Sequence, residues 1–159
     1  MTVMLSTGYV EKRNGSQSFG SLFNGGCIEV RTGTQPANAD MPVTGDLIAR
    51  ITRNGSAWTP GSPTAGLRFD VSGRQVFKRP TDDWRLVGIA EGTAGWIRLV
   101  GPEVDAGGAS VTLPRIDGAV AEIGQTVDAQ LFLPTLEITD TTLIDINYWW
   151  FATPPLSGE

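Results

Sequence analysis

Apolar and polar residues alternate along several short stretches of the chain. In the segments 27–32, 66–70 and 95–100, every second residue is apolar. A period of two places successive side chains on opposite faces of a strand. The apolar positions are Ile28, Val30, Leu67, Phe69, Ile97 and Leu99, and the positions between them include Glu29, Arg31, Arg68, Asp70, Trp96 and Arg98. Each segment is therefore predicted to be a strand with one apolar face.

Further stretches have the length and composition of short strands and are separated by turn residues. They are 46–53, 74–79, 85–90, 115–122, 128–133, 135–139 and 142–151. Roughly nine or ten short strands without a long helix predict an all-β protein, a single antiparallel β-sandwich of jelly-roll or immunoglobulin-like type. The pattern leaves both sandwich types open.

The first 26 residues do not follow the strand pattern. Ser6 or Thr7 could cap one short helical turn, and the segment 16–23 could form another before a pair of glycines. A chain of 159 residues is long enough for one domain with a real core and too short to expect two. We therefore expect an irregular N-terminal arm with short helical turns, residues 1–26, and one sandwich domain, residues 27–159.

A polar connection of about fourteen residues, from 32 to 45, separates two of the predicted strands. It is longer than the ~4–6 residues usual between elements, and such lengths occur in crossovers between sheets or in binding loops. Two prolines stiffen it, since each restricts its own φ and the residue before it. A structural crossover and a contact surface for a partner chain both remain open. In the second interpretation the candidate contact residues are Gln35, Pro36, Asp40 and Pro42.

The last predicted strand ends in the aromatic sequence YWWF, residues 148–151. Its alternation places Trp150 on one face and Trp149 and Phe151 on the other, so both faces become apolar. Such a strand needs a cover, either the N-terminal segment or another subunit. Core packing and an interface both remain open. We expect Trp150 in the core and take Trp149 and Phe151 as interface candidates.

The charges of the chain argue against two classes of partner. The net charge is −5, and the 12 Lys and Arg residues are scattered. A dispersed acidic surface repels phosphate, so neither nucleic acid nor an anionic membrane is expected as a partner. No apolar run approaches the ~18 residues that span a bilayer. The first fifteen residues also lack the pattern of an export signal, so we expect the protein to leave a cell only within an assembly or by lysis.

The residues that usually carry catalysis are sparse. The chain has no His, which excludes Ser-His-Asp and Cys-His nucleophiles and the common imidazole zinc sites. Strand-borne acids such as Asp70 and Glu137 keep a two-carboxylate glycosidase formally open, but nothing in their spacing supports it. The single Cys27 is expected to be a buried free thiol. We therefore expect no enzymatic activity, no metal and no cofactor.

Several short motifs follow one another in an order that resembles a known family. They are LSTG near the N-terminus, TGTQPANAD at 32–40 with the TG, L and IT that follow it, AGW and RL within 94–99, and DINYW at 145–149. Together they resemble a family of small proteins encoded in tailed bacteriophages and prophages, known mostly as hypothetical or virion-associated proteins. The resemblance covers most of residues 5–151. It departs at 9–22 and in the aromatic end.

The resemblance implies a structural part of a phage particle, with no cofactor and no catalytic residue. We expect a capsid (head) decoration protein that stabilises the head as a homo-oligomer. Its partners would be other virion proteins, with the major capsid protein favoured. It would be located in the virion after assembly in the bacterial host cytoplasm. The alternative is a neck, tail or fibre component of the virion, whose loops could bind a host glycan.

A function of another class also remains open. A small carbohydrate-binding or glycan-degrading domain could use Trp58, Trp84 or Trp96 as platforms on which a sugar ring stacks. Trp58 lies in a turn rich in Pro and Gly, where a side chain can be exposed. The competing interpretation is that each Trp packs against its own domain.

Overall fold

The computed structural model of the protein describes residues 3–152, and for residues 150–152 it describes the backbone only. Strands and two short helices make up this part of the chain. Their bounds are β1 Met4–Leu5, α1 Thr7–Asn14, α2 Phe19–Phe23, β2 Cys27–Arg31, β3 Leu47–Arg53, β4 Phe69–Ser72, β5 Gln75–Lys78, β6 Trp84–Gly88, β7 Gly92–Thr93, β8 Trp96–Val100, β9 Arg115–Glu122, β10 Leu131–Leu133, β11 Glu137–Ile138, β12 Leu143–Ile146 and β13 Trp150–Ala152. Neither helix is long or apolar enough to cross a membrane.

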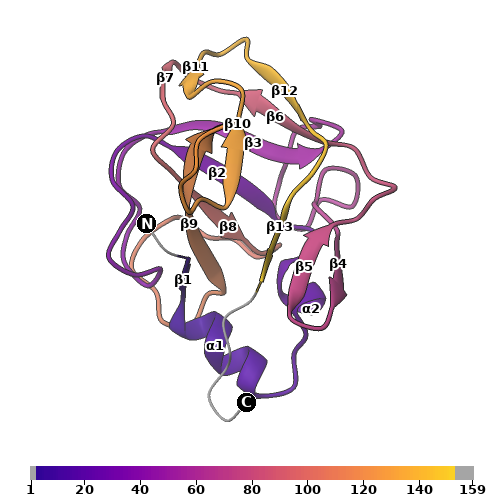
Figure 1. Ribbon diagram of the computed structural model, residues 1–159. Helices are drawn as coiled ribbons and strands as arrows, with labels where there is room; N and C mark the ends of the chain where they lie inside the picture. The colour runs from indigo at the N-terminus through magenta and orange to yellow at the C-terminus, as the bar shows by residue number, and fades with distance from the viewer. Residues whose placement is uncertain (1–2, 153–159) are drawn as a thin grey trace.

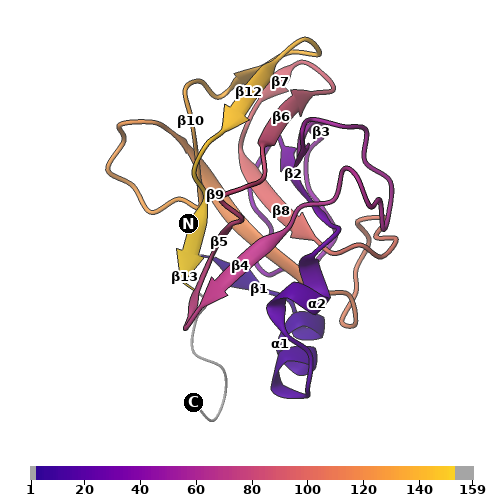
Figure 2. The same ribbon diagram turned by 90° about the vertical axis from the view of Figure 1, so that its right-hand side faces the viewer.

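One eight-stranded sheet dominates the structure. Its strand order is β1-β9-β8-β2-β3-β6-β12, with β10 also paired to β9. The pairing of β10 with β9 is parallel, and the other pairings in this sheet are antiparallel. Figures 1 and 2 show that the sheet twists strongly, with α1 and α2 at one end of the molecule and β7 at the other. The predicted all-β class is confirmed.

Two smaller sheets complete the fold. One has the order β13-β5-β4, and the other pairs β11 with β7. The core contains Phe69 and Val76 of the three-stranded sheet together with Ile28, Val30 and other apolar residues of the large sheet. Sheets of eight, three and two strands confirm neither the jelly-roll nor the immunoglobulin-like sandwich expected from the sequence.

The predicted alternation appears in the strands that form the core. Ile28 and Val30 of β2 and Ile97 and Leu99 of β8 all lie in the core, at most 3% exposed. These two strands pair in register, so their apolar side chains pack side by side. The 66–70 segment behaves differently, because β4 begins only at Phe69.

The N-terminal segment belongs to the same packing unit as the sheets. Ser6 caps α1 by accepting a hydrogen bond from the Tyr9 N–H, with 3.1 Å between N and Oγ. β1 pairs with β9, and Phe19 and Phe23 of α2 lie in the core. The rings of Phe19 and Phe69 meet edge to face with centroids 5.2 Å apart. Residues 3–26 therefore contribute to the core and do not lie on it as a separate arm.

The strand expected at 142–151 is divided into two. β12 pairs with β6 in the large sheet, whereas β13 pairs with β5 in the three-stranded sheet. The chain must change sheets between them, so residues 147–149 leave the strand pattern. A period-two pattern in the sequence does not show which sheet a strand joins, and for that reason the break was not predicted.

Candidate interaction surfaces

The long polar connection is closed at its neck by its two Thr-Gly pairs. β2 ends at Arg31 and β3 begins at Leu47, so this connection, named the 32–46 loop here, spans residues 32–46. Thr32 N–H donates to the Asp46 carbonyl at 3.0 Å, and Asp46 N–H donates to Thr32 Oγ1 at 2.9 Å. Gly45 has a φ of 68°, and a Cβ there would lie 1.9 Å from the Thr32 carbonyl oxygen. Only glycine fits this position.

The tip of the 32–46 loop is held by two arginines of the large sheet. Arg98 Nη2 of β8 donates to the Met41 carbonyl at 3.1 Å, and Arg115 Nη1 of β9 donates to the Ala39 carbonyl at 3.3 Å. The Val43 N–H also donates to the Gly107 carbonyl at 2.8 Å. Figure 1 shows the loop in purple along the side of the molecule, reaching toward α1. The loop therefore has a fixed path although it contains no regular structure.

Each of these arginines forms a buried, two-pronged ion pair. Arg98 donates to both Asp117 carboxylate oxygens at 2.7 and 2.9 Å, and both side chains are 0% exposed. Arg115 donates from Nε and Nη2 to the Asp105 carboxylate, with both distances 2.7 Å. Such fork-shaped pairs fix the direction of the guanidinium as well as its charge. The donors that remain are thereby aimed at the loop carbonyls.

The two carboxylates differ in pKa. Burial raises the pKa of Asp117, and the hydrogen bonds from Arg98 offset this only in part. Burial also acts to raise the pKa of Asp105, but hydrogen bonds from Arg115 and the Gly107 N–H outweigh it, so the pKa lies below its ordinary value. Asp105 is consequently the more acid-resistant partner.

The charged residues continue as a row across four neighbouring strands. In the strand register Asp117 of β9 lies opposite Arg98 of β8, Arg98 opposite Glu29 of β2, and Glu29 opposite Arg50 of β3. The signs alternate, so each residue has oppositely charged neighbours, an arrangement that stabilises a sheet. This row lies on the face of the sheet opposite the apolar core.

Cys27 lies at the end of β2 on the same polar face. It is a buried free thiol, as predicted. Burial, and then the charge of Glu29, raise the pKa of Cys27 to about 12, while Arg50 acts in the opposite direction. A thiol with this pKa is not a nucleophile at neutral pH.

The four contact residues predicted in the 32–46 loop have different surroundings. Gln35 and Pro36 are buried. Asp40 is half-buried, and its carboxylate accepts hydrogen bonds from the Thr7 N–H at 2.7 Å and the Thr7 hydroxyl at 2.5 Å. Pro42 is exposed. Contact with a partner stays a prediction for all four. In the isolated chain, Gln35, Pro36 and Asp40 face the protein and Pro42 faces solvent.

Met41 is an exposed loop residue that the sequence analysis did not single out. Its side chain lies next to Pro42 and is part of a residue 43% exposed. An apolar residue in a polar loop gives no periodic signal, so only the path of the chain shows that it is displayed. The exposed tip of the loop therefore consists of Met41 and Pro42.

The two terminal interface candidates also have different standing. Trp149 is only 4% exposed, and its ring packs against the rings of Phe69 and Trp84, with centroids 5.7 Å away in each case. It therefore has little surface for a partner. The backbone of Phe151 pairs with Val76, and the side chains of Trp150 and Phe151 lie outside the described residues.

The three tryptophans considered as sugar platforms are engaged within the protein. Trp84 and Trp96 are 1% and 0% exposed. Trp58 is half-buried, its Nε1 donates to the Gly25 carbonyl at 2.9 Å, and the guanidinium carbon of Arg50 lies 5.9 Å from its ring centroid. These rings are accordingly poor candidates for stacking on a sugar.

The acids considered for a glycosidase are not brought together. Asp70 lies on β4 of the three-stranded sheet and pairs with Arg79 at 3.1 Å. Glu137 lies on β11 of the two-stranded sheet and accepts a hydrogen bond from Thr93 at 2.9 Å. Within residues 3–152, no three His, Cys, Asp or Glu residues form a group that could hold a metal ion.

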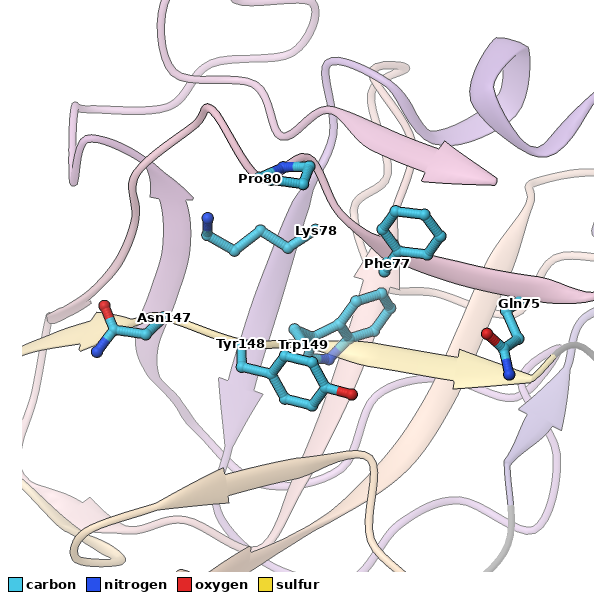
Figure 3. Close-up of a pocket in the computed structure, with 7 residues that line it drawn as sticks. All are labelled: Gln75, Phe77, Lys78, Pro80, Asn147, Tyr148 and Trp149. Carbon is cyan, nitrogen blue, oxygen red and sulfur yellow. The ribbon is translucent and has the colours of Figure 1, made fainter. Parts of the chain in front are cut away.

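A groove lies where the chain passes from β12 to β13 beside β5 (Figure 3). It has a volume of about 360 Å³ and is lined by Gln75, Phe77, Lys78, Pro80, Asn147, Tyr148 and Trp149. We name it the Tyr148 groove, since Tyr148 is 74% exposed. The sequence analysis missed it because pairing of distant segments creates it. The exposed tyrosine in the YWWF end was the only available signal.

A second hollow, of about 340 Å³, lies around Arg53 and Arg68. Its arginines are already engaged. Arg53 Nε donates to the Thr64 carbonyl at 3.1 Å, and Arg68 Nε donates to Asp82 at 2.7 Å. The hydrogen bonds from Arg68 hold the pKa of Asp82 below its ordinary value. These groups stabilise the local turn and offer less to a ligand than the Tyr148 groove.

Comparison of the chain with protein-family models, with curated proteins and with solved structures gives no match in any of the three. The likeness to phage virion proteins therefore stays an expectation from the motif order.

Proposed function

We propose that the protein is a structural component of a tailed-bacteriophage virion, and specifically a head decoration protein. The order of motifs along the chain supports the virion role. The observation that carries the contact role is the 32–46 loop, which is irregular and yet fixed at its neck and tip. In the proposed arrangement, the exposed Met41 and Pro42 meet the major capsid protein.

A fixed loop suits a surface that must bind many identical sites. Ordering a flexible loop on binding lowers affinity, because each immobilised residue loses conformational entropy. The ion pairs of Arg98 and Arg115 order this loop before any partner arrives. The displayed tip is small and apolar, which fits a shallow pocket on a protein surface.

The proposed test is rebinding of the purified protein to isolated phage heads and tails. The host phage that encodes the chain supplies both. We expect sedimentation with heads, and at least tenfold weaker binding for Met41→Asp, because a buried charge would face the apolar pocket. The control is Val71→Asp, at a residue 51% exposed on the three-stranded sheet. The control variant should bind as the wild type does.

Two results would change the proposal in different ways. Binding to tails or fibres but not to heads would replace decoration by the neck, tail or fibre role. Binding to neither, with the protein absent from purified particles by mass spectrometry, would contradict a place in the virion. The expected homo-oligomer is measured separately by light scattering of the free protein.

The neck, tail or fibre alternative retains one structural argument. Proteins at these positions meet the host surface, and the Tyr148 groove offers an aromatic ring together with amide groups. This groove is independent of the 32–46 loop, so both surfaces can be tested separately.

A further inference from the structure

The Tyr148 groove combines aromatic rings with polar groups that can both donate and accept hydrogen bonds. Phe77, Tyr148 and Trp149 supply the rings, and Gln75 and Asn147 supply side-chain amides. In Figure 3 the Tyr148 ring lies beside that of Trp149, with Asn147 toward one end of the groove and Gln75 toward the other.

The strand pairing keeps these groups in place. Lys78 N–H donates to the Trp149 carbonyl at 2.9 Å, and Phe77 pairs with Trp150 in the register of β5 and β13. The ring of Trp149 is anchored in the core against Phe69. Tyr148 therefore projects from a segment that is fixed on both sides, and it remains exposed without being mobile by construction.

The charge of the groove restricts its ligand. Of the lining residues, Lys78 alone is charged, and its ammonium already donates to the carbonyls of Asp82 and Arg79. A phosphate or a strongly charged peptide would find one cation and no second partner among these residues. A neutral ligand with many hydroxyl groups fits better, because each amide can pair with a hydroxyl as donor or acceptor.

We propose that the Tyr148 groove binds a pyranose sugar. One face of the sugar ring would stack on Tyr148, whose exposed aromatic face attracts the C–H groups of the ring, and Gln75 and Asn147 would bind its hydroxyls. The volume of about 360 Å³ lies within the range of small-molecule sites. This site stands on the groove alone, and it holds whether the protein decorates the head or belongs to the tail.

The test is an NMR titration of the full-length, ¹⁵N-labelled protein with methyl glucoside, methyl galactoside, methyl mannoside and N-acetylglucosamine at tens of millimolar. The side-chain amide signals of Gln75 and Asn147 report directly on the groove. We expect at least one sugar to shift both signals with a millimolar Kd. Tyr148→Ala should weaken binding about tenfold, since it removes the stacking ring.

Two matched variants separate stacking from general damage. Tyr148→Phe keeps the ring and should bind within about twofold of the wild type, because the hydroxyl is not required for stacking. Val104→Ala changes a residue that is 75% exposed on another connection and should bind as the wild type does. Tyr148 is itself exposed, so its substitution leaves the core unchanged.

Three results would overturn the proposal. The first is that none of the four sugars shifts the two amide signals. The second is that Tyr148→Ala binds as tightly as the wild type. The third is that the same signals shift with protein concentration in the absence of sugar, which would assign the groove to a second copy of the chain. Each of these results leaves the binding to heads or tails unaffected.

Discussion

Strands β2, β8 and β9 are buried on both faces, and the two faces are built from opposite chemistry. Toward the core lie Ile28, Leu99 and Ile116. Toward the 32–46 loop lie Arg98 and Asp117, both fully buried. One sheet therefore carries an oily face and a charged face, and neither meets water.

The difference between the faces shows how each is specified. Apolar packing has no preferred direction, so the core face can accept many side chains of suitable volume. A buried ion pair stabilises only one geometry, because an unpaired charge away from water is strongly unfavourable. The charged face can therefore hold an irregular loop in one path, which an apolar face would do less well.

The largest expected effect comes from breaking the charged face at Arg98. Arg98→Met leaves the Asp117 carboxylate without its fully buried partner, so we expect unfolding to become easier by about 3–5 kcal/mol. Urea unfolding measures this free energy. The control is Arg85→Met, whose pair with Asp145 is exposed and is expected to contribute about 1 kcal/mol or less. Equal losses for both variants would contradict the importance of the buried pair.

The next effect comes from the core face of the same strand. Leu99→Ala opens a cavity beside Ile28 and Ile116, and we expect a loss of about 2–5 kcal/mol. Leu99→Met keeps the volume and should lose less than about 1.5 kcal/mol. Urea unfolding again gives both values. If Leu99→Met is as damaging as Leu99→Ala, the core face is more demanding in shape than this comparison requires.

A smaller, pH-dependent effect distinguishes Asp105. Its pKa is depressed below the ordinary 3.8, so its contribution to stability is present above that value and is lost as the pH falls through the folded pKa. At pH 6 we expect Asp105→Asn to destabilise the protein by about 1–3 kcal/mol through the weakened bonds to Arg115. Unfolding at progressively lower pH should show the difference from the wild type shrinking.

Asp117 should act in the opposite direction in the same experiment. Burial raises its pKa, so the folded state binds a proton there more readily than the unfolded state does. Its contribution is present at low pH and is lost as the pH rises through the folded pKa. If Asp105→Asn and the wild type keep a constant difference in unfolding free energy at every pH, the proposed protonation of Asp105 does not occur.

The smallest expected effect concerns the contact between the 32–46 loop and α1. Asp40→Ala removes the acceptor for the Thr7 N–H and hydroxyl, and we expect a loss of about 1 kcal/mol, as for other helix caps. Thermal unfolding measures the change. The control is Asp46→Ala, at an exposed residue of the same loop. A loss for the control equal to that for Asp40→Ala would show that the loop charge, rather than the cap, is responsible.

The sequence predicted the core face much better than the charged face. The alternation of Ile97 and Leu99 is local, and it located β8 and its apolar side correctly. The same pattern could not show that Arg98 is buried, because its partner Asp117 and the loop carbonyl of Met41 come from other parts of the chain. Long-range pairing decides the burial of a polar residue.

The candidate surfaces show the same limit. The prolines of the 32–46 loop correctly indicated a shaped connection, but the residues that shape its tip, Arg98 and Arg115, lie in other elements. Trp149 has the same aromatic character in sequence as a surface anchor, and only the change of sheet after β12 places it in the core. The Tyr148 groove likewise depends on β5 pairing with β13.

The central claim is that the buried charges hold the 32–46 loop in its path. Hydrogen exchange of the Val43 amide, which donates to the Gly107 carbonyl, tests it most directly. We predict at least tenfold faster exchange of Val43 in Arg98→Met and no more than about a twofold change in Leu99→Ala, at a urea concentration of zero where both variants are folded. Unchanged exchange in Arg98→Met, or equal acceleration in both variants, would contradict the claim.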